Sequence, residues 1–307
     1  MASSSIVVRS VFHKPLLPLA AALRGLCDSE CCITQRRWRI GKRQQLSLHG
    51  PRRRHWSSII CAQQLGSGSA ARVESLSPKQ AGQVALFIDL LLDWNQRMNL
   101  TAVTERSAMM NRHIADSLSL IPMIEEAYTT HNYASTRSGS LKVIDVGSGA
   151  GLPGLVLAIS CPAWQVTLLE SLQKRCDFLE HVIKTVGLPN VQIVHSRAED
   201  AGQDAKFREV YDVAVARAVA EMRVLAELCL PLVRVGGIFV AAKGPNPQEE
   251  VEAAKAAVEL LGASTVSLCA VDSEGPLGQR TAVVCLKDHA TPAKYPRRAG
   301  MPNKRPL

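Results

Sequence analysis

Aromatic residues, long apolar runs and clustered cysteines are all scarce in this chain of 307 residues. Trp, Tyr and Phe make up 4% of it, so extensive stacking of nucleic-acid bases on aromatic side chains is not expected. The apolar stretch 16–26 is too short and too broken to span a bilayer. Five of the nine cysteines lie beyond residue 63 without a C-x-x-C spacing, so we expect neither a metal site nor a disulfide framework.

Acidic residues are nearly missing from the first 63 residues, which hold 11 of the 36 Lys and Arg but only two of the 27 Asp and Glu. Residues 64–307 therefore hold 25 of each sign, and the formal charge of +9 belongs to the leader. Many Ser and Arg with few acids are typical of an organelle transit peptide. Because Ile60-Cys61-Ala62 resembles a chloroplast processing site, we expect residues 1–62 to be a disordered chloroplast transit peptide. A mitochondrial address, or a polybasic segment for RNA or membranes, is the alternative.

Two helical segments are expected after the leader. Residues 63–74 are rich in Gly, Ser and Ala and read as a linker. The run Ser77 to Gln80 predicts a helix start with a capping box, and apolar residues then recur at helical spacing. A second helical stretch is expected over 106–128, followed by a polar link. Residues 75–138 would thus form a helical amino-terminal subdomain.

Strands and helices alternate from residue 139 to 287. We expect strands at 141–146, 165–170, 191–195, 211–216, 237–243, 265–271 and 280–286, and helices at 152–160, 173–186, 219–233 and 247–261. Asn246 is expected to cap the last helix, with Pro247 in its first position. This α/β alternation predicts a parallel sheet with helices on both faces and an antiparallel hairpin at one edge. The layout resembles the Rossmann-like seven-stranded sheet of class I S-adenosylmethionine-dependent methyltransferases.

A glycine-rich turn directly after the first strand is the strongest candidate for a ligand site. The run Val143 to Gly154 reads V-I-D-V-G-S-G-A-G-L-P-G, and glycine lets the backbone approach a ligand closely. A dinucleotide site would begin its G-x-G-x-x-G at once after the strand, whereas the literal match here, from Gly149, begins two residues late. Asp145 would repel phosphates but suits a cationic sulfonium. We therefore interpret the run as an S-adenosylmethionine site, with NAD as the alternative.

Charged residues at the other strand ends are further site candidates, because ligands of open α/β sheets bind outside the carboxyl ends of the strands. Glu170 ends the second strand and can accept the ribose hydroxyls of an adenosine. Glu199-Asp200 follows the third strand and can hold the adenine amino group. Arg217 ends the apolar fourth strand, where an unpaired charge is costly. It is expected to face cofactor or substrate, with an ion pair to Asp145 or Asp212 as the alternative.

The turn after the fourth strand also bears on the methyl acceptor. Amino-group methyltransferases often carry Asn/Asp-Pro-Pro-Tyr/Phe there, whereas this chain has Ala216-Arg217-Ala218-Val219. A ring nitrogen such as guanine N7 is favoured instead, because its lone pair is already exposed and no proton has to be removed. Transfer then needs mainly the alignment of nucleophile, methyl and sulfur. We expect no catalytic base, and Arg217 is the one candidate for a catalytic role.

Several segments together resemble one family, the ribosomal RNA small subunit methyltransferase G family of the glucose-inhibited-division B type. The segments are Asn99-Leu100-Thr101-Ala102, Arg112-His113-Ile114-Ala115-Asp116-Ser117, the glycine-rich turn and Ala216-Arg217-Ala218. The resemblance covers about residues 75–307 and implies methyl transfer to N7 of a guanine in the decoding region of 16S-type rRNA, here in a plant organellar member. By position, the residues that would contact or shape the cofactor site are Gly147, Gly149, Gly151, Leu152, Glu170, Ala198, Glu199 and Arg217.

Basic residues in two places are expected to face the RNA. Arg112 and His113 resemble a substrate element, with a satisfied core histidine as the alternative for His113. The basic tail 288–307 contains Lys294, Arg297, Arg298, Lys304 and Arg305, and its prolines predict an extended arm for phosphate contacts; a solvated tail is the alternative. We expect this tail and the region 97–112 to concentrate the positive potential. We expect a monomer whose partner is small-subunit rRNA or a 30S-type particle. A non-catalytic assembly factor is the alternative function.

Overall fold

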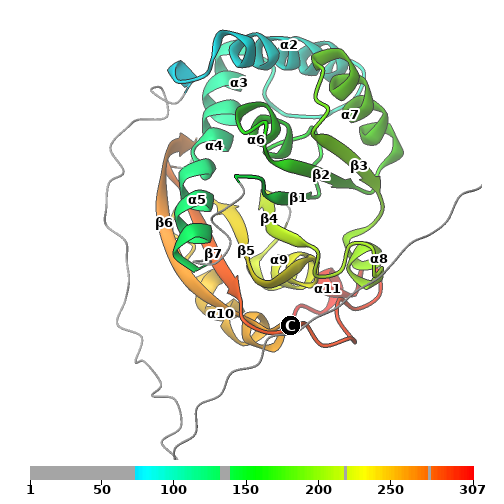
Figure 1. Cartoon of the computed structure of the whole chain (residues 1–307), viewed down its shortest axis with the longest axis vertical. Helices are drawn as coiled ribbons and strands as arrows, with labels where there is room; N and C mark the ends of the chain where they lie inside the picture. The colour runs from blue at the N-terminus through cyan, green and yellow to red at the C-terminus, as the bar shows by residue number, and fades with distance from the viewer. Residues whose placement is uncertain (1–72, 132–138, 218–219, 276–277) are drawn as a thin grey trace, which may run out of the picture. The chain divides into compact units, whose positions relative to one another are not determined.

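The computed structural model describes residues 73–131, 139–217, 220–275 and 278–307. The predicted transit peptide, nearly all of the predicted linker and most of the polar link after the second helical stretch lie outside these residues. Figure 1 shows the described part as one twisted sheet with helices packed on both of its faces.

The sheet has seven strands in the order β3-β2-β1-β4-β5-β7-β6. The strands are β1 (Lys142–Val146), β2 (Gln165–Glu170), β3 (Val191–His195), β4 (Tyr211–Arg217), β5 (Val233–Lys243), β6 (Ala263–Gly275) and β7 (Gly278–Lys287). Strands β1 to β5 pair in parallel, while β7 pairs antiparallel with both β5 and β6. The predicted edge hairpin is therefore confirmed. The order reverses between β1 and β4, and the carboxyl ends of these two strands form the switch point at which ligands of such sheets bind.

The helices follow the predicted alternation, with differences at their ends. They are α2 (Pro78–Asn95), α3 (Arg106–Met109), α4 (Ala115–Leu118), α5 (Leu120–His131), α6 (Gly154–Ser160), α7 (Gln173–Val186), α8 (Ala198–Gln203), α9 (Met222–Cys229), α10 (Gln248–Leu260) and α11 (Met301–Lys304). The capping box of α2 is confirmed, because Ser77 and Gln80 accept hydrogen bonds from each other's backbone amides. The predicted cap of α10 is wrong. Asn246 has φ of +54° and the helix begins two residues later, at Gln248.

The second helical stretch is not one continuous helix. Between α3 and α4 the backbone widens into a π-helix, η1 (Met110–Ile114), and Ser119 separates α4 from α5. Short π-helical turns inside α-helices are frequent at functional sites. Here η1 contains the predicted substrate residues Arg112 and His113.

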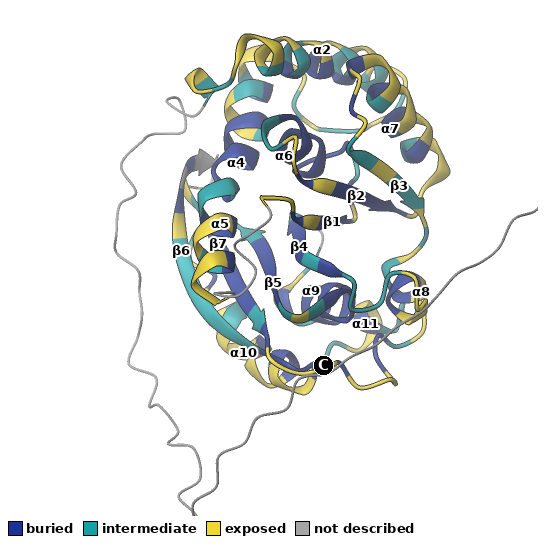
Figure 2. Ribbon diagram, in the orientation of Figure 1, coloured by how far each residue is buried: buried dark blue, intermediate teal, exposed yellow. Residues whose placement is uncertain are grey.

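Alternation along the strands divides the core between the two faces of the sheet. Val143 and Val240 belong to one hydrophobic cluster, whereas their neighbours Ile144 and Ala241 belong to the other. The first cluster contains residues of α2, α5, α6 and α7, and the second contains residues of α8, α9 and α10. Figure 2 shows the central strands dark with burial and the outer surfaces of α2 and α10 largely exposed. Helices that cover both faces are typical of parallel sheets.

The helices of residues 75–131 share the core of the sheet. Phe87 and Ile88 of α2 are fully buried in the same cluster as Phe178 of α7. The ring centroids of Trp94 and Phe178 lie 5.5 Å apart in a tilted arrangement, which is a geometry that aromatic pairs prefer. These helices therefore pack on one side of the sheet beside α6 and α7.

The carboxyl-terminal tail is folded onto the body, so the prediction of an extended arm is wrong over α11. Arg297 makes a two-pronged ion pair with the fully buried Glu227 of α9, and its Nη2 lies 2.5 Å from Glu227 Oε2. The backbone amide of Arg297 donates a further bond to Glu227 Oε1 at 2.8 Å. Lys287 is also buried. The basic residues Arg297 and Lys287 are visible in the sequence, but the sequence does not show that the groups they contact lie in the core.

We expect the ion pair of Arg297 to matter for stability. Arg297→Ala leaves the buried Glu227 carboxylate without its partner, which should lower the free energy of unfolding by about 3–5 kcal/mol. The matched control is the exposed neighbour Arg298, whose change to Ala should alter stability by less than about 0.5 kcal/mol. Denaturant unfolding of the three proteins tests this, and equal stability of Arg297→Ala and Arg298→Ala would contradict it.

Candidate cofactor site

The glycine-rich turn after β1 is held against the neighbouring strand. The amides of Gly147 and Ser148 both donate to the carbonyl of Leu169 in β2, at 2.9 and 3.1 Å. Gly147, Gly149 and Gly151 have φ of +74°, +57° and +84°, a region that residues with a side chain rarely adopt. A Cβ on Gly149 would meet no atom closer than 3.8 Å, which leaves that part of the turn open to a ligand.

Asp145 is buried at the carboxyl end of β1, with 1% of its surface exposed. Its Oδ2 accepts the amide proton of Gly154 at 2.9 Å, which connects the strand to the first residue of α6. Burial raises the pKa of this carboxyl from 3.8 to about 7, against the opposing effects of the Gly154 amide and the charge of Arg217. Asp145 is thus a carboxyl that changes charge near neutral pH beside the turn.

Glu170 stabilises the turn from the end of β2. Its Oε1 accepts the amide protons of Ser171 and Leu172 at 2.8 and 2.9 Å, and its Oε2 accepts that of Gly149 at 2.9 Å. Arg175 lies 3.7 Å from Oε2. Because Oε1 already accepts two amide protons, Oε2 is the oxygen with capacity left for a ribose hydroxyl. Ribose binding by Glu170 stays a prediction.

Arg217 ends β4 next to Asp145, and its side chain has no acidic partner within ion-pair distance among the described residues. The predicted alternative of a pair with Asp212 is wrong, because Asp212 pairs with Arg234 at 2.8 Å. Burial lowers the pKa of Arg217, while the nearby charges of Asp116 and Asp145 raise it. A partly buried guanidinium without a paired carboxylate can bind an anionic or polar group of a ligand.

A polar cluster joins η1 and α4 to the edge hairpin near Arg217. His113 Nε2 lies 2.8 Å from Thr101 Oγ1, and burial, followed by the charge of Arg217, lowers the pKa of His113 to about 4. Its imidazole is therefore neutral at neutral pH. The buried Asp116 accepts a hydrogen bond from Ser273, and its Oδ2 lies 3.0 Å from Arg280 Nε.

Ser273 and Arg280 were missed from the sequence. They lie on β6 and β7, and the only signal was an arginine near the start of an otherwise apolar strand. Asp116 itself was visible in the R-H-x-x-D-S motif. Its partners come from strands more than 150 residues further along the chain, so only the fold could identify them.

The residues after β3 lie in the first turn of α8. Of the predicted acidic pair, Glu199 is buried and Asp200 is exposed to solvent. Glu199 Oε1 accepts the amide proton of Gly300 from the tail at 2.8 Å. Ala198 is partly exposed, and Leu152 of the turn is buried.

The predicted RNA-facing residues differ in their surroundings. Those with exposed side chains are Arg112, Lys294, Arg298, Lys304 and Arg305. The expectation that the whole region 97–112 concentrates positive charge is wrong for two of its arginines. Arg97 forms an ion pair with Asp93, and Arg106 forms one with Asp89.

These residues fit the predicted S-adenosylmethionine. A turn of positive-φ glycines that is open at Gly149, an acid that can ionise beside a cation and a guanidinium without a paired carboxylate lie at the switch point of the sheet. In the parts of the chain that the structure describes, no three His, Cys, Asp or Glu are grouped to hold a metal ion. None of the described helices is both long and apolar enough to cross a bilayer.

Comparison with known proteins points to one family. A family model described as rRNA small subunit methyltransferase G matches residues 80–280. The chain is 42% identical over 233 residues to the Ribosomal RNA small subunit methyltransferase G of Moorella thermoacetica. The aligned residues make up 76% of this chain and 92% of that relative. The chain is 45% identical over 248 residues to the protein of that name from Symbiobacterium thermophilum, covering 79% and 96%. Among solved structures, a superposition with the METTL16 methyltransferase domain includes 57% of this chain and 69% of that domain. The TM-score is 0.44 and the sequence identity 14%, so this similarity is too distant to bear on function.

The match to the family model, together with the order of the seven strands, confirms the predicted class I methyltransferase fold. The chain belongs to the rRNA small subunit methyltransferase G family, whose members are methyltransferases with S-adenosyl-L-methionine as cofactor.

Proposed function

We propose that this chain transfers a methyl group from S-adenosyl-L-methionine to N7 of a guanine in the decoding region of 16S-type small-subunit rRNA, inside the chloroplast. The carrying observation is the buried Asp145 beside an open glycine turn at the switch point of the sheet. The relatives' names supply the substrate, small-subunit rRNA. The basic leader supports the organellar address.

The residues of the site divide the binding of the cofactor among them. Asp145 offers a negative charge at the turn, Glu170 Oε2 offers an acceptor for the ribose, and Ala198 and Glu199 lie where the adenine is expected. The bound cofactor supplies an electrophilic methyl group on a cationic sulfonium. Holding that group in line with an incoming ring nitrogen is the main contribution of the protein to the rate.

The groups near Arg217 are compatible with guanine N7 as the methyl acceptor, because this atom carries no proton that a base would have to remove. The imidazole of His113, whose pKa the charge of Arg217 helps to lower, is neutral at neutral pH. A cationic histidine would repel the positively charged ring that N7 methylation creates, whereas a neutral one does not. Arg217, which has no acidic partner within ion-pair distance among the described residues, provides positive charge for a phosphate of the target nucleotide.

The first expected outcome concerns activity. The chain from about Ala62, incubated with methyl-labelled S-adenosylmethionine and small-subunit rRNA that lacks the modification, should label one guanine that strand cleavage identifies as N7-methylated. Arg217→Ala and Gly147→Asp should each lower the rate by at least about 100-fold. The lost guanidinium and the new side chain at a positive φ both disturb the alignment of the methyl group.

Two matched variants control this experiment. Arg223→Ala removes a partly exposed arginine of α9, and Gly82→Asp places a carboxylate on an exposed helical glycine with no atom within 4 Å of the new Cβ. Both should keep full activity. Full activity of Arg217→Ala and Gly147→Asp would contradict the proposed site, and rescue of ribosome assembly by these inactive variants would favour a non-catalytic assembly factor.

The second expected outcome concerns pH. Because the pKa of Asp145 is about 7 and a cation binds its ionised form better, cofactor affinity should rise as the pH increases from 6 to 8. The sign follows from proton release on binding. Asp145→Asn cannot ionise, so it should bind more weakly and with little pH dependence. Calorimetry at several pH values measures both, and tighter binding of the parent protein at low pH would count against the role of Asp145.

The third expected outcome concerns the leader. Residues 1–63 fused to a fluorescent reporter should direct it to chloroplasts in plant cells, because the segment is rich in Ser and Arg and poor in acids. A second fusion that begins at residue 64 should stay outside. Import into mitochondria alone, or no import of the first fusion, would contradict the address.

A further inference from the structure

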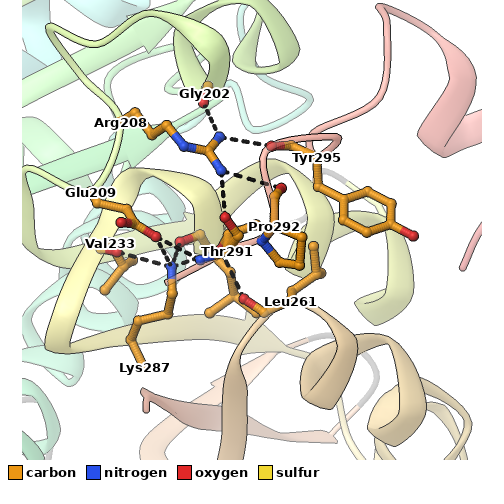
Figure 3. A network of polar contacts seen from close by, with 10 residues as sticks. Gly202, Arg208, Glu209, Val233, Leu261, Lys287, Thr291, Pro292 and Tyr295 are labelled. Carbon is orange, nitrogen blue, oxygen red and sulfur yellow. Dashed lines mark hydrogen bonds and ion pairs between the residues drawn. The ribbon is translucent and has the colours of Figure 1, made fainter. Parts of the chain in front are cut away.

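The tail beyond β7 is fastened to the body by two side chains, one from the last residue of α8 and one from the segment after it. Arg208 donates to the carbonyls of Thr291 and Tyr295, each at 2.7 Å, and also to that of Gly202 in α8. Figure 3 shows this guanidinium between the helix and the tail. Gln203 adds a bond to the carbonyl of Pro296 at 2.7 Å.

The beginning of the tail is fixed by a buried lysine. Lys287 Nζ donates to the carbonyls of Leu230 and Val233 and to Thr291 Oγ1, and it lies 3.3 Å from Glu209 Oε1 (Figure 3). All these partners belong to the protein, so Lys287 is not available to RNA. Lys287 is the last residue of β7, directly before the tail, and its charge is used in these internal contacts.

The tail also lies tightly against α8 itself. A Cβ on Gly202 would lie 2.7 Å from Pro296 Cγ. At the other end of the helix, the amide of Gly300 donates to Glu199 Oε1 at 2.8 Å. The tail thus contacts α8 at both its first and its last turn, and one of these contacts is to a residue of the proposed adenine site.

We propose that residues 288–307 are a positioning element for the cofactor site, which fixes the orientation of Glu199 and thereby sets the affinity for S-adenosylmethionine. The inference rests on the proposed placement of the adenine beside Ala198 and Glu199. Different residues of the tail contact the body and the RNA. Gly300 and Arg297 hold the body through Glu199 and Glu227, and the exposed Arg298 and Lys304 remain for RNA.

Gly300 offers a direct test, because its φ is +80° and no atom lies within 4 Å of a Cβ placed there. Gly300→Val would fit the space but not the backbone conformation, whereas Asn tolerates positive φ. We expect Gly300→Val to raise the Kd for S-adenosylmethionine about tenfold, the equivalent of one hydrogen bond to a charged group. Gly300→Asn should stay within about twofold of the parent chain. Calorimetry on the chain from about Ala62 measures both.

Two further readouts separate positioning from general damage. In methyl transfer, Gly300→Val should raise the KM for S-adenosylmethionine and leave kcat at saturation unchanged. The double variant Arg298→Ala with Lys304→Ala should weaken rRNA binding and leave the cofactor Kd unchanged. If Gly300→Val does not fold, Gln203→Ala removes a side-chain donor to the tail at an exposed position and should raise the Kd in the same direction.

Each outcome bears on a different claim. A cofactor Kd that is the same in the parent chain, Gly300→Val and Gln203→Ala would overturn the positioning role while leaving the proposed function intact. Failure of the parent chain itself to bind S-adenosylmethionine would defeat the cofactor site. A higher Kd in the Arg298 and Lys304 double variant would show that the charge of the tail, and not its contact with Glu199, controls affinity.

Discussion

The buried carboxyl of Asp145 joins the end of β1 to the start of α6 through the amide of Gly154. A Cβ on Gly154 would lie 2.4 Å from Leu168 Cδ2, so only glycine lets the helix approach the strand this closely. The same carboxyl lies beside the turn and loses its proton near neutral pH. The contact that shapes the turn thus also places a titrating acid at the cofactor site. On the other side, Glu170 accepts a hydrogen bond from the amide of Gly149 in the turn.

Arginine and lysine have two uses in this molecule. Arg297, Arg208 and Lys287 satisfy buried carboxylates and backbone carbonyls and so hold the tail on the body. Buried charges of this kind are strongly destabilising when one partner is removed. Other cations, such as Arg112 and Arg298, are exposed and remain free for a polyanionic substrate. Since residues 64–307 have no net charge, RNA binding depends on where these exposed bases lie.

Much of the fold could be predicted because the strands are short, apolar and separated by helical periodicity. The bounds of β2, β3 and α7 agree with the prediction to the residue. Helical periodicity could not reveal the π-turn of η1, because the same apolar spacing fits a continuous α-helix. Asn246 fits a helix cap by composition, but its left-handed backbone places it before the helix. The acid Glu227 on the buried face of a predicted helix was the one signal for the docked tail, and its partner is 70 residues away.

The site could be predicted wherever local sequence determines geometry, and not where partners come from distant elements. Asp145, Glu170 and the turn glycines are close in sequence or lie on adjacent strand ends. The pairing of Asp116 with Ser273 and Arg280, and of Glu199 with Gly300, depends on how the edge hairpin and the tail pack. The most direct measurement is the titration of the Asp145 carboxyl carbon by NMR, with and without S-adenosylmethionine. We expect a pKa near 7 for the protein alone and a clearly lower one with cofactor bound. An ordinary pKa near 4 in both states, or no change on binding, would contradict the role of Asp145.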